Sequence, residues 1–187
     1  MSNNENRIDS GEASDIECSF EILIQDVCAR MEVAGSLRRG LLDVGDIEIV
    51  AEPMYTASGD NKLHERLERL LRIGTISLDR PRKDKKKNPF GQKYYRLNYN
   101  TRYDGEDKTY PVDLFVVTPP ADFNVIYLIR TGSADFSHNF VSKGWAYGIH
   151  VKDGHLEKEG VEIRTTSERD VFAKMHVPYV EPENRVK

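Results

Sequence analysis

The segment GDIEIVAEP, residues 45–53, constrains the fold more than any other part of the chain. Charged and apolar residues alternate along it and the run ends at Pro53, which predicts a strand over residues 46–51. Side chains two positions apart lie on one face of a strand, so Asp46 and Glu48 face one way while the isoleucines beside them face a core. The fold must therefore bury one face of this strand and carry two adjacent carboxylates on the other.

Two carboxylates so close together repel each other and resist joint ionisation, and a divalent cation is the simplest remedy. A third acid, Asp113, stands as a lone charge within the apolar run VDLFVV, where it is costly unless a partner or a metal neutralises it. Hard oxygen ligands suit magnesium or manganese. The sequence therefore predicts that Asp46, Glu48 and Asp113 form a site for two Mg²⁺ ions, with Mn²⁺ as the alternative metal.

The segment GSLRRG, residues 35–40, lies one loop before the acid pair. Gly35 allows the backbone to approach a ligand closely, and Ser36 offers a hydroxyl and an N–H group. Arg38 and Arg39 can pair with phosphate oxygens. The segment predicts a phosphate cradle large enough for a triphosphate.

Apolar periodicity and turn residues predict the remaining elements. In chain order these are a helix over 18–31, a helix over 63–71, strands over 75–78, 94–99 and the run PVDLFVV, helices over 123–129 and 138–145, a hairpin with Asp153-Gly154 at its tip, and a last helix behind a capping box from Thr165 to Glu168.

Composition is that of an ordinary globular protein, with 39% hydrophobic and 31% charged residues, and no apolar run approaches the length of a membrane span. Residues 1–17 are polar and lack the features of a signal peptide, so we expect a disordered tail and a cytoplasmic protein with no membrane partner.

The formal net charge of −4 argues against nucleic-acid binding when taken alone, but cations gather in one short segment. They are Arg80, Arg82, Lys83, Lys85, Lys86 and Lys87. Together with the aromatic residues that follow them, these cations predict a surface that tracks phosphates and stacks on bases. The aromatic residues are Phe90, Tyr94, Tyr95 and Tyr99. A solvated loop without a nucleic-acid partner is the alternative.

The combination of GS, RRG, GDIE and a later VDL resembles the nucleotidyltransferase superfamily, and the RRG places it close to the family X DNA polymerases related to polymerase beta. Two later segments, IRTGSADFSHNF and PYVEPENR, also look like parts of that family. The resemblance implies an α+β chain without a lyase or helix-hairpin-helix module in front. Its parts would be a palm of mixed β-sheet packed on helices over 18–119, including a basic loop at 80–93, and a small α+β nucleotide-selecting domain over 120–187.

The resemblance also implies an activity, which is addition of a nucleotide from a nucleoside triphosphate to a DNA 3′ end, of a gap-filling or repair type. Gly35, Ser36, Arg39 and the backbone at Gly45 would hold the triphosphate, and Asp46, Glu48 and Asp113 would bind the two Mg²⁺ ions. The sugar and base pocket would be lined by Thr131, Gly132 and Ser133. A monomer is expected, located in the host cytoplasm if the source is a virus or phage.

The chain departs from the family pattern at three places. Glu48 stands where an aspartate is usual, and Pro111 replaces an arginine two residues before the third acid, so Asp113 lacks a familiar partner. Ile129 and Arg130 replace an aromatic pair before TGS. These departures keep two other functions open, namely nucleotide transfer to a small-molecule or protein hydroxyl, and a catalytically weakened nucleic-acid-binding module.

Overall fold

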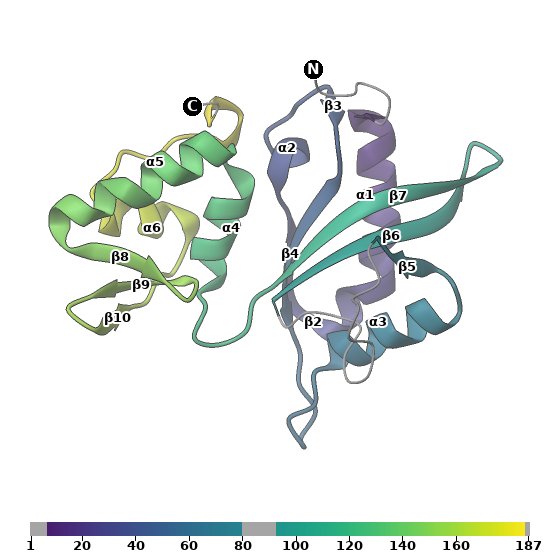
Figure 1. The fold of residues 1–187 in the computed structure, drawn as a ribbon, viewed down its shortest axis with the longest axis horizontal. Coiled ribbons are helices and arrows are strands. Elements are labelled where there is room, and N and C mark those ends of the chain that lie inside the picture. The colour runs from purple at the N-terminus through teal and green to yellow at the C-terminus, as the bar shows by residue number, and fades with distance from the viewer. Residues whose placement is uncertain (1–6, 80–92, 186–187) are drawn as a thin grey trace.

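The computed structural model describes residues 7–79 and 93–185. The chain is α+β, as the sequence predicts, and forms two parts that lie side by side (Figure 1). The N-terminal part contains a five-stranded sheet, and the C-terminal part combines three α-helices with a three-stranded sheet. The peptide bond between Pro119 and Pro120, in the segment that joins them, is cis. None of the helices within the described ranges has the length and apolar character needed to cross a bilayer.

The N-terminal sheet has the strand order β2-β4-β7-β6-β5 and is mixed, because its central pair β4 and β7 is parallel and the other pairs are antiparallel. A two-residue turn at Asp104-Gly105 connects β6 to β7, and both turn residues have positive φ angles. In spatial order the strands are β2 (Cys28–Val33), β4 (Ile47–Pro53), β7 (Glu106–Val116), β6 (Tyr94–Tyr103) and β5 (Ile76–Leu78).

Two helices, α1 (Ser10–Ile24) and α3 (Lys62–Arg72), cover one face of this sheet (Figure 1). Their apolar residues form one core with the inward side chains of the strands, among them Ile47 and Ile49, which are fully buried as predicted. The opposite face carries the acids and faces the C-terminal part. The remaining short elements are β1 (Ile8–Asp9), which pairs with β3 (Asp43–Val44), η2 (Gln25–Val27) and α2 (Gly35–Arg38).

The N-terminal predictions were wrong in two respects. Residues 8–17 are not a disordered tail, because Ile8–Asp9 forms β1 and α1 begins at Ser10 with the Asp9 side chain accepting from the N–H of Gly11. The predicted helix over 18–31 ends at Ile24, and strand β2 begins at Cys28.

The C-terminal part contains α4 (Phe123–Thr131), α5 (Ala134–Gly144), η3 (Trp145–Tyr147), β8 (Ile149–Lys152), β9 (His155–Lys158), β10 (Val161–Ile163), α6 (Glu168–Lys174) and η4 (Pro182–Asn184). The predicted hairpin at Asp153-Gly154 is confirmed between β8 and β9. The predicted capping box from Thr165 to Glu168 is wrong, because Ser167 is the N-cap of α6 and Glu168 is its first residue. Ser167 caps α6 by accepting from the N–H of Asp170, and the Asp170 carboxylate accepts from the N–H of Thr166.

A buried ion-pair network connects the two parts. The Glu168 carboxylate accepts from both terminal nitrogens of Arg38, Oε1 from Nη1 and Oε2 from Nη2 at 2.8 Å each, and from Arg185 Nη1 at 2.7 Å. The Arg185 side chain is 0% exposed. We call this network the Arg38–Glu168–Arg185 clasp. Arg38 also lies over the Tyr127 ring, so its guanidinium is engaged by side chains of the C-terminal part, and its pairing with phosphate stays a prediction.

The clasp sets the ionisation of its acid. Burial opposes the charged form of Glu168, but hydrogen bonds and positive charge from Arg38 and Arg185 outweigh burial and lower its pKa to about 2. Because the folded pKa lies below the unfolded value near 4.5, the ionised carboxylate stabilises the fold above pH 4.5 and loses that contribution as the pH falls toward 2.

We therefore expect Glu168→Gln to lower the free energy of unfolding at pH 7 by about 3 kcal/mol, because Arg185 would keep a buried charge without its carboxylate. Urea denaturation followed by circular dichroism measures this, and the difference from wild type should shrink between pH 4.5 and pH 2. The matched control is Glu181→Gln, which removes an exposed pair with Arg169 and should cost less than about 1 kcal/mol. Equal losses in both variants would contradict a stabilising clasp.

Candidate active site

The structure brings the three predicted acids together on the face of the sheet opposite α1 and α3. Strands β4 and β7 pair in parallel with Glu48 directly opposite Asp113. Asp46 immediately precedes β4, and its carboxylate reaches the same group of charges. Three carboxylates from two neighbouring strands therefore share one small region, with the C-terminal part beside it.

Arg96 lies among these acids. It is opposite Asp113 in the antiparallel pair of β6 and β7, and its Nε is 3.3 Å from Asp113 Oδ1. The same guanidinium is 3.4 Å from Asp46 Oδ2 and 3.8 Å from Asp79 Oδ2. Tyr94 donates its hydroxyl to Asp113 Oδ2 at 2.8 Å. Burial raises the pKa of Asp113, while the hydrogen bond from Tyr94 and the charge of Arg96 act against this rise.

Glu48 is the most perturbed acid of the group. Burial raises the pKa of its carboxyl to about 7, and the negative charges of Asp46 and Asp113 act in the same direction. The positive charges of Arg39 and Arg130 act against the rise. Arg130, which replaces an aromatic residue of the family pattern, thus adds a cation near the acids. Near neutral pH the Glu48 carboxyl is therefore poised between its two protonation states.

Gly35 makes room for Glu48. A Cβ atom on Gly35 would lie 1.6 Å from Glu48 Oε2, so the carboxylate occupies the space that any other side chain would need. Gly35 also has a φ of +61°, which glycine adopts without strain. The sequence predicted that this glycine lets a ligand approach, and the structure shows that it first lets an acid of the site approach.

The RRG and TGS segments contact each other directly. Arg39 donates from Nη1 to the carbonyl oxygen of Thr131 at 2.6 Å, and Arg38 donates to the Thr131 hydroxyl. Ser133 caps α5 by accepting from the N–H of Phe136, so the predicted pocket residues sit at the junction of α4 and α5. The predicted cradle and the predicted sugar pocket are therefore adjacent.

The three acids offer the type of ligand that a divalent cation prefers, although their present positions do not form an ion site. Asp113 is only 7% exposed, and its Oδ1 atom is buried without a hydrogen-bond partner among the described residues. Such an oxygen needs positive charge, and the three carboxylates together offer the hard oxygen ligands that Mg²⁺ and Mn²⁺ prefer. Within residues 7–79 and 93–185, no three His, Cys, Asp or Glu side chains are placed to share one ion as they stand. Arg96 occupies the space beside two of the acids.

A polar hollow of about 640 Å³ lies near the acids, and residues next to them in the chain, rather than the acids themselves, line it. Two of its lining residues connect it to the site, because Gly45 precedes Asp46 in the chain and Asp79 is an ion-pair partner of Arg96. Lys108 contributes a cation to its wall. The complete lining is Arg7, Ile8, Glu12, Gly45, Asp79, Asn98, Lys108, Thr109, Tyr110 and Pro111.

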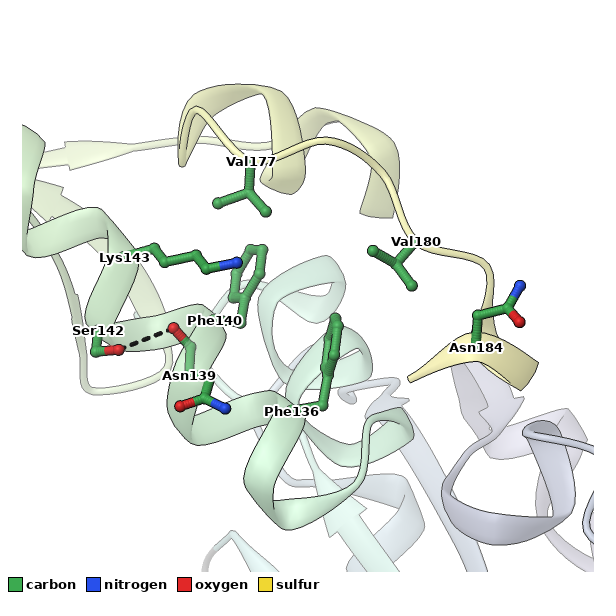
Figure 2. A pocket seen from close by; sticks show the side chains of 8 residues that line it. All are labelled: Phe136, Asn139, Phe140, Ser142, Lys143, Val177, Val180 and Asn184. Carbon is green, nitrogen blue, oxygen red and sulfur yellow. Dashed lines mark hydrogen bonds between the residues drawn. The ribbon is translucent and has the colours of Figure 1, made fainter. Parts of the chain in front are cut away.

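A second hollow, of about 340 Å³, lies on the C-terminal part between α5 and the segment after α6 (Figure 2). Phenylalanine side chains come from α5, while Val177 and Val180 come from the later segment. Its lining consists of Phe136, Asn139, Phe140, Ser142, Lys143, Val177, Val180 and Asn184. Sequence reasoning did not find this hollow, because its two sides come from segments about forty residues apart.

The predicted nucleic-acid surface is only partly described. Its six cations and one of its aromatic residues lie outside the described residues, namely Arg80, Arg82, Lys83, Lys85, Lys86, Lys87 and Phe90. Tyr95 and Tyr99 are each 4% exposed and belong to the core, so the prediction that they stack on bases is wrong. Tyr94 is exposed but bonds to Asp113. Arg96 was missed as a site residue, although Tyr94 and Arg96 alternate with core residues in YYRLNY.

The C-terminal part matches a family model. Residues 126–186 match the model described as DNA polymerase beta thumb. This match covers about the last third of the chain and supports a relationship to the family X DNA polymerases. A search of curated proteins found no match.

The contact of Gly35 with Glu48 generates a stability prediction. Gly35→Ala should lower the free energy of unfolding by more than the roughly 1 to 2 kcal/mol of left-handed backbone strain, because the new Cβ must also displace the Glu48 carboxylate. Urea denaturation gives the value.

Gly40→Ala is the matched control, since Gly40 has a φ of +71° but nothing within 4 Å of an added Cβ. Adding Glu48→Ala to Gly35→Ala should recover part of the loss by removing the displaced carboxylate. Equal costs for the two glycine variants would refute the steric contact.

Proposed function

We propose that the protein is a metal-dependent nucleotidyltransferase of the family X polymerase type, with the N-terminal part as its catalytic palm. It adds a nucleoside monophosphate from a nucleoside triphosphate to the 3′-hydroxyl of a DNA strand and releases pyrophosphate. The observation that carries the proposal is the pairing of Glu48 with Asp113 across β4 and β7, with the Asp46 carboxylate close by. The match of residues 126–186 to the polymerase beta thumb model supports it.

Asp46, Glu48 and Asp113 would hold the divalent cations. When bound, such cations lower the pKa of the attacking hydroxyl and neutralise charge on the triphosphate and the departing pyrophosphate. Asp113 accepts the proton of the 3′-hydroxyl. Burial raises the pKa of its carboxyl toward the working pH, which suits a proton acceptor. Burial, helped by the negative charges of Asp46 and Asp113, raises the pKa of Glu48 to about 7, so this carboxyl gains most from added positive charge.

Binding of the triphosphate falls to the cradle beside the acids. Ser36 and the backbone at Gly35 and Gly45 contact the phosphates, and Arg39 contributes charge. Arg39 is already fixed by its bond to the Thr131 carbonyl, so its guanidinium is held in place before the ligand arrives. Thr131, Gly132 and Ser133 then lie beside the sugar and base. Holding these groups in advance lowers the entropic cost of reaching the reactive geometry.

DNA is the proposed acceptor for three reasons. The family matched by the C-terminal part is described by its name as a DNA polymerase thumb. The polar hollow beside Asp46 contains Lys108 and can take the end of a strand. The basic cluster at 80–87 supplies phosphate-binding charge from the sequence, and each neutralised phosphate should add a log–log salt slope of about −0.7 to −0.9.

The experiment incubates the protein with a labelled primer, offered alone, annealed to a template, or in a one-nucleotide gap, with Mg²⁺ or Mn²⁺ and each nucleoside triphosphate. Extension by the complementary nucleotide on annealed or gapped DNA identifies a templated polymerase. Extension of the bare primer identifies a terminal transferase. Absence of extension in every condition would refute a DNA acceptor and direct the search to small-molecule or protein hydroxyls.

In the same assay, Asp113→Asn should reduce the rate on the order of 10²- to 10⁴-fold, because the variant loses the proton acceptor and a ligand charge. Asp107→Asn is the control, since Asp107 lies exposed on the same strand six residues earlier. The control should retain the wild-type rate. Full activity in Asp113→Asn would exclude the proposed role.

A further inference from the structure

Arg96 is a cation shared among acids of three different elements. Its guanidinium lies 3.3 Å from Asp113 on β7, 3.4 Å from Asp46 ahead of β4 and 3.8 Å from Asp79 after β5. All three contacts are longer than a well-formed charge-assisted hydrogen bond, which is about 2.7 to 2.9 Å. The Asp113 oxygen nearest to Arg96 has no hydrogen-bond partner among the described residues, so charge alone holds this pair.

The clasp shows what a permanent arginine contact looks like in the same molecule. Arg38 holds Glu168 through two bonds of 2.8 Å, with side chains 15% and 10% exposed. The Arg96 side chain is 46% exposed and has no bidentate contact with any of its three acids. Water can therefore solvate Arg96 when it leaves an acid, and its release is far less costly than release of Arg38.

Arg96 and a divalent cation require the same oxygens. Asp46 and Asp113 are two of the three acids that fit the ion, and positive charge from Arg96 reaches both. Like charges exclude each other at such distances, so the guanidinium and the ion cannot both occupy this space. Asp79 offers Arg96 another carboxylate within reach of a small side-chain rotation.

We propose that Arg96 is an exchangeable counterion, which neutralises Asp46 and Asp113 in the ion-free protein and moves toward Asp79 when a divalent cation binds. It acts as a positioning residue, because it keeps the acids from repelling each other before the ion arrives. The inference rests on the proposed metal site but concerns a residue on β6 that is not one of its ligands. It also explains how Asp113 is neutralised although Pro111 stands where an arginine is expected.

The test measures binding of Mn²⁺ alone, by the electron paramagnetic resonance signal of the free ion, without nucleotide or DNA. Arg96→Gln removes the competitor, so Mn²⁺ should bind about tenfold more tightly than to wild type. Asp79→Asn removes the alternative partner and should act in the opposite direction, weakening Mn²⁺ binding several-fold. In the double variant, Asp79→Asn should have little further effect, because the arginine through which Asp79 acts is gone.

Arg102→Gln is the matched control. Arg102 lies on the same strand, donates to the Gly105 carbonyl at 2.9 Å, and should leave Mn²⁺ affinity unchanged. Circular dichroism confirms folding of each variant. Unchanged or weaker Mn²⁺ binding in Arg96→Gln, or additive effects in the double variant, would overturn the inference while leaving the metal site intact. Asp113→Asn should abolish Mn²⁺ binding. If wild type binds no Mn²⁺, or if Asp113→Asn binds it as wild type does, the metal site itself and the inference both fail.

Discussion

Repulsion among three carboxylates is the constraint on which the arrangement of the site depends. The parallel register of β4 and β7 fixes Glu48 beside Asp113, and the backbone cannot relieve this crowding without breaking the centre of the sheet. The surroundings compensate in several ways. Gly35 leaves space for the Glu48 carboxylate, and Arg39 and Arg130 add positive charge near it. Even so, the pKa of Glu48 remains raised to about 7, so these charges compensate only part of the burial and repulsion.

Arg38 and Arg96 differ in how far their side chains are buried, and their contacts differ accordingly. Arg38 belongs to a motif whose sequence suggests phosphate binding, yet it joins the two parts of the molecule through Glu168. Removing one member of such a buried network leaves an uncompensated charge, which makes the contact permanent. Arg96 makes longer contacts at a more exposed place, where ion pairs contribute little to stability. The residue type is the same, but the difference in solvent access separates an arginine that holds the fold from one that we propose can exchange with an ion.

The sequence predicted those helices and strands in which apolar residues recur at a single spacing, either that of a helix or that of a strand. The alternation in DIEIV gave the strand and the burial of Ile47 and Ile49. The predicted helix over 18–31 was too long because Val27 and Cys28 continue the helical spacing, and no glycine or proline marks its end at Ile24. The structured N-terminus was missed because its residues are polar, although Asp9 is a typical N-cap.

One missed feature was readable from the sequence. The turn at Asp104-Gly105 pairs Tyr103 with Glu106, and counting outward along both strands without a bulge places Arg96 opposite Asp113. The length of the hairpin, ten residues on the β6 side, was the unknown. Sequence reasoning ended the first strand at Tyr99 and did not carry the pairing through the turn. The clasp was beyond such counting, because its members come from three elements that only tertiary packing brings together.

The position of Arg96 also affects the space available to an acceptor. A side chain at position 111 projects from the same face of β7 as Asp113, because the two positions are two residues apart. Pro111 lines the polar hollow beside the acids, and an arginine there would extend into it. Arg96 instead approaches Asp113 from β6. Placing the positive charge one strand away therefore neutralises the acids and leaves the hollow open near Asp113, the carboxylate that we propose as the proton acceptor.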